Sequence, residues 1–570
     1  MSVPSSATAS EAASPLPRSA VEDVAAMLPE WLETVRRVHR QSGFQAAIWH
    51  DGELIAEVAV GSADESAGIP LRTTHRLRIA SHSKTFTALA VMRLREQGRL
   101  RLDDTVGDHV DELAGSPVAD RTLRDLLSHS AGLTRDSDDS RWWRLGTPFP
   151  DRERLLEIAR TGAVKAEAGL HLQYSNIGYG LLGLVIEAVM GTGFAEAIAE
   201  LVLEPVGVAG VGPDLPPDSP GPEQADGFAL GHTSLLHGPR RAVEQISTGA
   251  LAAATGFWAD AGSIATYAGR ALTEGALLAP GSLREMRRRV WTLRDGGQYG
   301  LGLQEGRLHG FTVIGHSGGF PTGLSRTWAA PAERLAVSVI GTAVDAPSSD
   351  IALGILGLLA LAAGRPAPQA EEWERAGAQG GAADGRSRPA VLADQPAVSV
   401  AAARGGSRAA AGDSPAPTDG SLPATQVAEL VAGTYDSLWG RTRVVVLGGR
   451  LFSVDEAVTD PAATALELCV SGVRADPIEA GMEAVELATW GDSGYGTWAE
   501  PILARLVRAD AGAGDGAVGD GGDGDSDAGD GSWGDGGDGG VRLRCAGLVV
   551  TGQVRTPSAD FVMPERVTAP

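Results

Sequence analysis

The chain has very little cysteine and very little lysine. Only Cys469 and Cys545 are cysteine, which excludes a disulfide framework, and we predict two buried free thiols. Lysine and arginine together number 48, yet only Lys84 and Lys165 are lysine. The protein therefore uses arginine almost everywhere that it carries a cation, and a lysine within a motif is informative.

The sequence is also short of positive charge as a whole. Its formal net charge of −24 argues against nucleic acid or an anionic membrane as the main partner. Nine aspartates and no lysine or arginine lie in residues 509–540, a Gly/Asp-rich insertion that cannot bury a core. Within it, Asp523, Asp525 and Asp527 are followed by Ala528, where a calcium loop needs glycine, and no glutamate closes the loop. We therefore expect a solvated, disordered loop and no calcium site.

Long apolar runs are absent as well. The first 20 residues contain no basic stretch followed by an apolar one, so we expect no signal peptide and a cytoplasmic protein. The longest apolar run, residues 351–364, is too short to span a bilayer comfortably and is predicted to be a buried helix. No membrane span is expected.

The distribution of sequence patterns predicts two domains. Residues 1–20 resemble a disordered tail, and residues 21–365 a first domain. Within this domain, residues 43–64 are two extended runs about Asp51-Gly52, which predicts a hairpin, and three more extended runs lie between 311 and 342. The segment between these strands has helical periodicity. The expected fold class is therefore α/β of the α+β type, with one antiparallel sheet flanked by helices, plus a helical subdomain.

The C-terminal part has a different composition. Residues 366–424 are rich in Ala, Gly, Pro and Ser without periodicity, which predicts a flexible linker. From residue 425 to 570 short strand patterns return, with a Gly-Gly turn at 448–449. These patterns predict a small all-β, barrel-like domain that the insertion at 509–540 interrupts.

One of the two lysines lies in the stretch Ser81-His82-Ser83-Lys84. Apolar residues such as Phe86 follow at helical spacing, and residues three apart share a helix face, so Ser81 should meet Lys84 while Ser83 should not. A desolvated lysine can take the proton of a serine hydroxyl and make it a nucleophile. Alternatively, Ser-x-x-Lys is a short pattern that arises by chance in long proteins.

A second candidate is Tyr174-Ser175-Asn176, which precedes an apolar helix. A tyrosine near a cation can transfer protons, and an amide can hold both a lysine and a substrate carbonyl. The alternative is a turn followed by a helix N-cap, which Ser175 or Asn176 would satisfy equally well. His129, in an apolar setting, is predicted to be a structural, hydrogen-bonded core residue.

A third stretch, Gly315-His316-Ser317-Gly318-Gly319, fits the Gly-x-Ser-x-Gly nucleophile elbow of α/β-hydrolases. That elbow must open into a helix, but another strand-like run follows here. The elbow's triad also needs a histidine after the serine, and the sequence contains none beyond His316. The sequence therefore argues against an elbow.

In this order, the three stretches resemble the serine β-lactamase and penicillin-binding-protein superfamily. The resemblance is strongest to its class C-like branch, which includes esterases and D-aminopeptidases, and covers roughly residues 35–363. Its motifs are Ser-x-x-Lys, Tyr-x-Asn and Lys or His followed by x-Gly, here Ser81 to Lys84, Tyr174 to Asn176, and His316 to Gly318. Residues 21–365 are thus expected to be a serine hydrolase domain, and residues 425–570 resemble an appended lipocalin-like domain.

The resemblance implies a role for each motif residue. Ser81 would be the acylated nucleophile, and Lys84 and Tyr174 would exchange its proton. Asn176 would orient Lys84 and the substrate, while His316 and Gly318 would lie on the strand lining the pocket. The backbone N–H groups of Ser81 and Gly319 would form the oxyanion hole, a term worth roughly 3–4 kcal/mol per donor. No metal or cofactor is expected.

Histidine at position 316 departs from the lysine form of the motif. With a reference pKa of ~6.5, histidine is mostly neutral at cytoplasmic pH and does not supply the charge that holds a β-lactam or peptide carboxylate. We therefore expect hydrolysis of carboxylic esters or of D-amino-acid amides or peptides. The alternatives are β-lactamase or D-Ala-D-Ala carboxypeptidase activity, or a non-catalytic binding or regulatory protein. The sequence does not indicate an oligomeric state.

Overall fold

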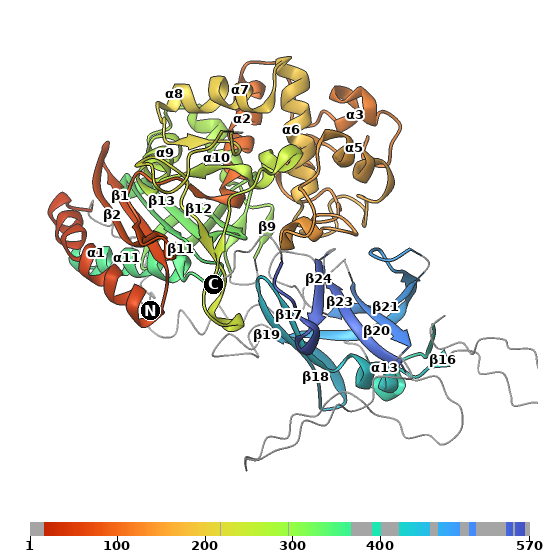
Figure 1. Ribbon diagram of the computed structural model, residues 1–570. Helices are drawn as coiled ribbons and strands as arrows, with labels where there is room; N and C mark the ends of the chain where they lie inside the picture. Colours follow the sequence, from red (N-terminus) through yellow and green to blue (C-terminus); the bar gives the residue numbers. More distant parts are fainter. Residues whose placement is uncertain are drawn as a thin grey trace, which may run out of the picture.

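A computed structural model of the protein describes most of the two predicted domains (Figure 1). The described residues are 16–216, 218–293, 296–365, 390–400, 421–455, 465–480, 482–490, 501–508, 543–550 and 553–564. Residues 1–15 of the predicted tail, most of the predicted linker and the insertion with its aspartates lie outside the described residues.

The first domain is built on one antiparallel sheet, to which nine strands of the described chain contribute (Figure 1). In spatial order these are β3 (Ile69–Pro70), β2 (Glu53–Asp64), β1 (Gly43–His50), β14 (Leu335–Gly341), β13 (Gly323–Ala330), β12 (Phe311–Phe320), β11 (Gln304–Leu308), β10 (Gln298–Tyr299) and β9 (Trp291–Thr292). The early hairpin turns at Asp51 and Gly52, both with positive φ, as predicted. The two ends of the domain meet where β1 pairs with β14.

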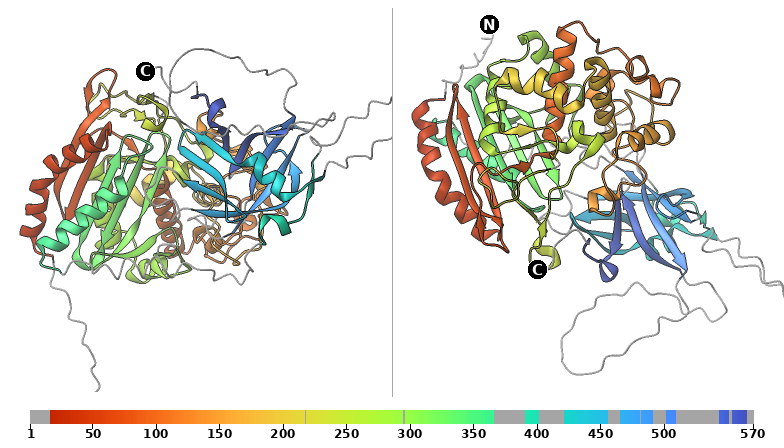
Figure 2. Two further views of the ribbon diagram at one scale, coloured as in Figure 1. Left: turned by 90° about the horizontal axis from the view of Figure 1, so that it is seen from below. Right: turned by 45° about the horizontal axis from the view of Figure 1, so that its top comes forward.

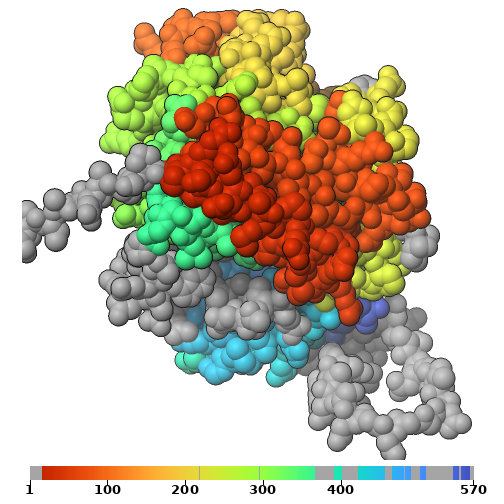
Figure 3. All heavy atoms as spheres, turned by 90° about the vertical axis from the view of Figure 1, so that its left-hand side faces the viewer, coloured from red at the N-terminus to blue at the C-terminus, as the bar shows by residue number. Residues whose placement is uncertain are grey.

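Both faces of the sheet are covered, so all eight residues of β1 are buried. Helix α1 (Arg18–Val38) and helix α11 (Ser348–Ala362) pack side by side on one face and form the outer surface in Figure 3. Because α1 begins at Arg18, the predicted disordered tail is too long by three residues. The apolar run at 351–364 is a helix with its core-facing side buried, as expected.

The opposite face carries the remaining helices and several two-residue strands. The helices are α2 (Ser83–Glu96), α3 (Val106–His109), α4 (Leu123–Leu127), α5 (Arg152–Thr161), α6 (Asn176–Met190), α7 (Phe194–Ile198), α8 (Glu204–Val206), α9 (Ala261–Ala268) and α10 (Pro280–Arg287). The strands are β4 (Leu77–Arg78), β5 (Val211–Gly212), β6 (Gly231–His232), β7 (Ala242–Val243) and β8 (Trp258–Ala259). The fold class is the predicted α+β arrangement.

No single helix among the described residues combines the length and apolar composition needed to cross a membrane. The helical segments 176–190 and 194–206 reach that length and apolar composition only when they are taken together, and their axes are bent by 82° relative to each other.

The C-terminal part is a closed barrel of eight described strands, beside the first domain in both views of Figure 2. These are β17 (Gly433–Ser437), β18 (Gly440–Leu447), β19 (Arg450–Asp455), β20 (Leu466–Ala475), β21 (Glu483–Trp490), β22 (Ile502–Arg508), β23 (Leu543–Val550) and β24 (Gln553–Pro557). Pairing of β17 with β24 closes the barrel. Both cysteines belong to it as free thiols, but only Cys545 is buried; Cys469 is half-buried.

The structure corrects part of the linker prediction. Residues 390–400, expected to be linker, include β15 (Val398–Ser399), which pairs with β16 (Ser421–Leu422). Val398 and Val400 are buried in the barrel core, together with residues of α13 (Ala424–Val431). Composition suggested a linker because Ala, Gly and Pro dominate the segment, whereas two or three valines suffice to anchor a short strand.

Candidate active site

Ser81 is presented by a tight turn between β4 and α2. It lies half-buried in a short 3₁₀ helix, Ala80–His82, and Ala80 holds a positive φ of 45°, a conformation that costs a non-glycine residue free energy. The Ser83 hydroxyl stabilises this turn by donating to the Ala80 carbonyl at 2.5 Å and accepting from the Phe257 N–H at 3.0 Å. The Ser83 hydroxyl is thus bonded to the backbone of the turn, whereas the Ser81 Oγ lies 3.2 Å from the Lys84 Nζ.

Lys84 is fully buried one helical turn after Ser81. Its Nζ lies 3.2 Å from the Ser81 Oγ, 2.7 Å from the Asn176 Oδ1 and 2.8 Å from the Ala254 carbonyl oxygen. A neutral amine has two N–H donors for the two carbonyl-type oxygens, and its lone pair is then left for the Ser81 hydroxyl. Burial lowers the Lys84 pKa well below its usual value, and nearby Arg135 lowers it further. The neutral, basic form of Lys84 therefore persists to lower pH than in an exposed lysine.

Asn176 is held in place by residues that sequence patterns did not indicate. Its Nδ2 donates to the Asp136 Oδ1 at 2.7 Å, and the indole N–H of Trp143 donates to the same oxygen at 2.8 Å. Asp136 is completely buried and its charge opposes the lowering of the Lys84 pKa. In the sequence, Asp136 is one of several acidic residues in a loop, so nothing marked it as the buried one.

The ring of Tyr174 lies next to the Lys84 amine. The Lys84 Nζ is 4.6 Å from the centre of its ring, and the imidazole of His129 packs on the ring at 4.2 Å. Ser175 caps α6 by accepting from the Gly178 N–H at 2.8 Å. Ser175 is thus the helix N-cap that the alternative interpretation required, and its two neighbours contact Lys84.

His129 is buried and acts as predicted for a structural residue. Its Nδ1 accepts from the Ser175 N–H at 3.1 Å, and its Nε2 lies 3.2 Å from the Tyr299 hydroxyl. The same hydroxyl lies 3.3 Å from the Nε2 of His316. Tyr299, which no sequence motif indicated, thus links His129 to His316 on strand β12.

His316 lies on β12, where it is 1 % exposed. Burial lowers its pKa well below the usual range, and the proximity of Lys84 adds to this effect. Gly318, two residues on, packs so tightly that a Cβ atom there would lie 2.0 Å from the Ile79 carbonyl oxygen. The strand is therefore held directly against the backbone that precedes Ser81.

The second half of β12 is paired with a described strand on one side only. Strand β11 pairs with residues 311–315, and β13 pairs with residues 314–320 on the other side. No strand of the described chain pairs with residues 316–320 on the β11 side. This edge includes Gly319, whose N–H we predict to form the oxyanion hole with that of Ser81.

Three buried histidines predict a loss of stability in acid. Burial lowers the pKa of His82 to about 4, and it also lowers those of His129 and His316 well below the usual value. Because unfolded histidine titrates near 6.5, stability is fully present above that pH and falls as the pH drops toward 4. His82 alone should contribute roughly 3 kcal/mol to this loss.

Urea unfolding followed at pH 7.5, 6.0, 5.0 and 4.5 would measure this effect. The exposed His39 offers a matched control, since a His39→Gln protein should show the same pH dependence as the original chain. An unfolding free energy that is constant between pH 7.5 and 4.5 would contradict the prediction.

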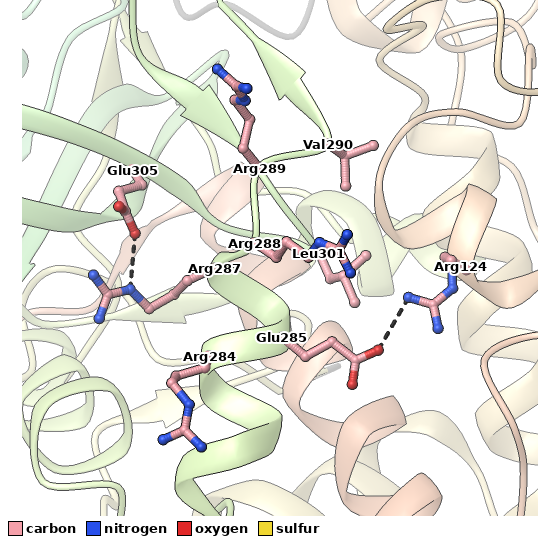
Figure 4. A pocket seen from close by; sticks show the side chains of 9 residues that line it. All are labelled: Arg124, Arg284, Glu285, Arg287, Arg288, Arg289, Val290, Leu301 and Glu305. Atoms are coloured by element: carbon pink, nitrogen blue, oxygen red, sulfur yellow. Dashed lines mark hydrogen bonds and ion pairs between the residues drawn. The ribbon is translucent and has the colours of Figure 1, made fainter.

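A surface depression of about 1090 Å³ lies elsewhere on the first domain (Figure 4). It is lined by Arg124, Arg284, Glu285, Arg287, Arg288, Arg289, Val290, Leu301 and Glu305, with ion pairs from Arg287 to Glu305 and from Arg124 to Glu285. None of the motif residues lines it. Its lining contains no serine, threonine, cysteine or lysine.

The α+β fold, the Ser-x-x-Lys pair and the strand bearing His316 together define the class of β-lactamase-like and penicillin-binding-protein-like serine hydrolases. The chain belongs to the Beta-lactamase family, whose model matches residues 30–362, more than half of the sequence.

Among curated proteins, the chain is similar to Esterase EstB of Burkholderia gladioli, with 32% identity over 203 residues, 33% of this chain and 51% of that protein. It is 28% identical over 187 residues to Penicillin-binding protein 4 of Amycolatopsis lactamdurans, 31% of this chain and 46% of that protein. The matches thus span only about half of these relatives.

Among solved structures, the octameric penicillin-binding protein homologue from Pyrococcus abyssi superposes with a TM-score of 0.52 and 21% identity. The superposition covers 84% of this chain and 95% of that one. SurE superposes with a TM-score of 0.51 and 22% identity, covering 95% and 99%. At this identity the likeness concerns the fold.

Proposed function

We propose that the protein is an active serine hydrolase that forms an acyl-enzyme at Ser81. The observation that carries this proposal is the position of Lys84, whose Nζ is 3.2 Å from the Ser81 Oγ and is buried with two carbonyl-type acceptors. A structural lysine would keep its charge near solvent or beside a carboxylate. Burial that favours a neutral amine instead suits a base.

In the proposed reaction, neutral Lys84 takes the proton of Ser81 as the Oγ attacks the substrate carbonyl carbon. The N–H groups of Ser81 and Gly319 stabilise the oxygen anion of the tetrahedral intermediate. The proton passes through Tyr174 to the leaving alcohol or amine as the bond to it breaks. A water molecule then gives its proton to the Lys84 and Tyr174 pair and attacks the acyl carbon. The bond between that carbon and the Ser81 Oγ breaks as the Oγ takes up the same proton, which releases the acid and regenerates Ser81.

We propose carboxylic esters or D-amino-acid amides or peptides as the substrates. Buried His316 stands where the lysine form of the motif carries a charge, and its lowered pKa keeps the imidazole neutral. The guanidinium of Arg326 packs on the Trp328 ring at 4.2 Å and donates to the Gln304 side-chain oxygen. The similarity to an esterase supports the same choice.

Parallel hydrolysis of p-nitrophenyl butyrate, D-alanine p-nitroanilide and nitrocefin at pH 7.5 tests this preference. We expect kcat/KM for the better of the first two to exceed that for nitrocefin at least about tenfold, since a charge-assisted contact to the β-lactam carboxylate is missing. The Ser81→Ala protein serves as the blank. Nitrocefin as the fastest substrate would instead indicate a β-lactamase.

A further inference from the structure

The hairpin turn between β17 and β18 is buried in the first domain. Ser437 pairs with Gly440, so Leu438 and Trp439 form a two-residue tip. Such a tip normally faces water, yet Leu438 is 0 % exposed and packs with Leu145 and Val243 of the first domain. The barrel is therefore docked through this turn.

Polar contacts around the tip hold the barrel in place. The His237 Nε2 lies 2.9 Å from the Ser437 carbonyl oxygen, and the His237 ring packs on Phe561 at 4.6 Å. Arg144 donates to the Thr556 hydroxyl at 3.4 Å. These contacts come from both ends of the barrel sequence, so the tip approaches the first domain in one defined orientation.

Trp439 reaches the candidate active site from this tip. Its indole N–H donates to the Trp143 carbonyl oxygen at 3.0 Å, and the two rings meet edge to face at 6.1 Å. A Cβ atom on Gly319 would lie 3.6 Å from the Trp439 ring. The ring therefore lies close to the backbone of Gly319, the predicted oxyanion donor.

The ring also completes an aromatic wall. Trp143 packs edge to face against Phe149 at 5.1 Å and Phe320 at 5.9 Å, and Trp439 extends this group toward solvent, where it is half-buried. The remaining members are buried, so Trp439 is the member of this wall that a substrate can touch.

We propose that Trp439 is a specificity-determining residue, with which the barrel limits the bulk of the substrate's acyl group beside Gly319. This inference rests on the proposed function. It predicts a substrate with a small acyl group, because a rigid indole held by a hydrogen bond and by edge-to-face packing leaves little room for a branched or aromatic one.

Comparing p-nitrophenyl acetate with p-nitrophenyl benzoate tests the inference in the full-length protein. Trp439→Ala should raise the ratio of kcat/KM for benzoate to that for acetate at least about tenfold, and Trp439→Phe about threefold. Leu447→Ala is the matched control, since Leu447 is 54% exposed at the other end of β18, and its ratio should not change. A ratio is chosen because a merely structural role would lower both activities together.

The inference is overturned if Trp439→Ala leaves the benzoate-to-acetate ratio of kcat/KM unchanged, whether both esters are hydrolysed as before or both are slowed in parallel. The proposed function would then still stand. If Trp439→Ala does not fold, the ratio in Trp439→Phe decides in the same way. An original protein that hydrolyses neither ester and takes no fluorophosphonate label overturns the proposed function, and this inference with it.

Discussion

The Ser81→Ala protein is expected to take no fluorophosphonate label and to hydrolyse esters at least about 10⁴-fold more slowly than the original chain. The reason is that the acyl group has no other acceptor at this position, since the neighbouring Ser83 hydroxyl is bonded to the Ala80 carbonyl and the Phe257 N–H. Labelling can be followed by fluorescence of the protein band and by the mass of the adduct-bearing peptide.

Ser83→Ala is the matched control for that experiment. It removes a hydroxyl two residues away, so it should lower the free energy of unfolding but leave the label on Ser81. A label that persists in Ser81→Ala would place the nucleophile elsewhere. If the original protein takes no label at all, the non-catalytic binding or regulatory alternative is favoured.

Replacing Lys84 by methionine should lower kcat/KM about 10³-fold, within the usual range for removal of a general base. Met retains the apolar stem of the lysine but cannot take the Ser81 proton or donate to Asn176. The chain offers a matched control in its other lysine, Lys165, which pairs with Asp138 at 2.9 Å on the partly exposed surface. Lys165→Met should keep its activity.

The pH dependence of kcat/KM identifies what Lys84 does. Since burial lowers its pKa well below the usual value of a lysine, the neutral base persists to lower pH than in an ordinary lysine, and activity falls as the pH drops through that lowered pKa. Lys84→Met should lose this acidic limb. Lys84→Arg, which stays charged, should be as inactive as Lys84→Met; an active arginine variant would show that charge rather than basicity is needed.

Much of the site follows from short-range geometry. The meeting of Ser81 and Lys84 depends only on helical spacing, which brings residues three apart onto one face, and the distance of 3.2 Å agrees with it. The turn at Asp51-Gly52 likewise follows from the preference of such residues for positive φ. The roles of Tyr174, Asn176 and His316 were predicted from the family resemblance of their motifs. In the structure, Tyr174 and Asn176 contact Lys84, and His316 lies next to Tyr174.

Other features depend on contacts between residues far apart in the chain. Three buried partners of the site occur in stretches of sequence without a distinctive pattern. Only folding brings Asp136 to Asn176, Trp143 to Asp136, and Tyr299 to His316. The same holds for Val398 and Val400, whose burial overturned part of the linker prediction.

The docking of the barrel turn is the most remote of these contacts. Trp439 lies 296 residues after Trp143 in the chain, and no local rule of helix, strand or turn formation relates the two. The local sequence could specify a two-residue hairpin, because that depends on the backbone of neighbouring residues. Which surface the hairpin meets depends on the summed packing of two domains, and that is a property of the folded chain alone.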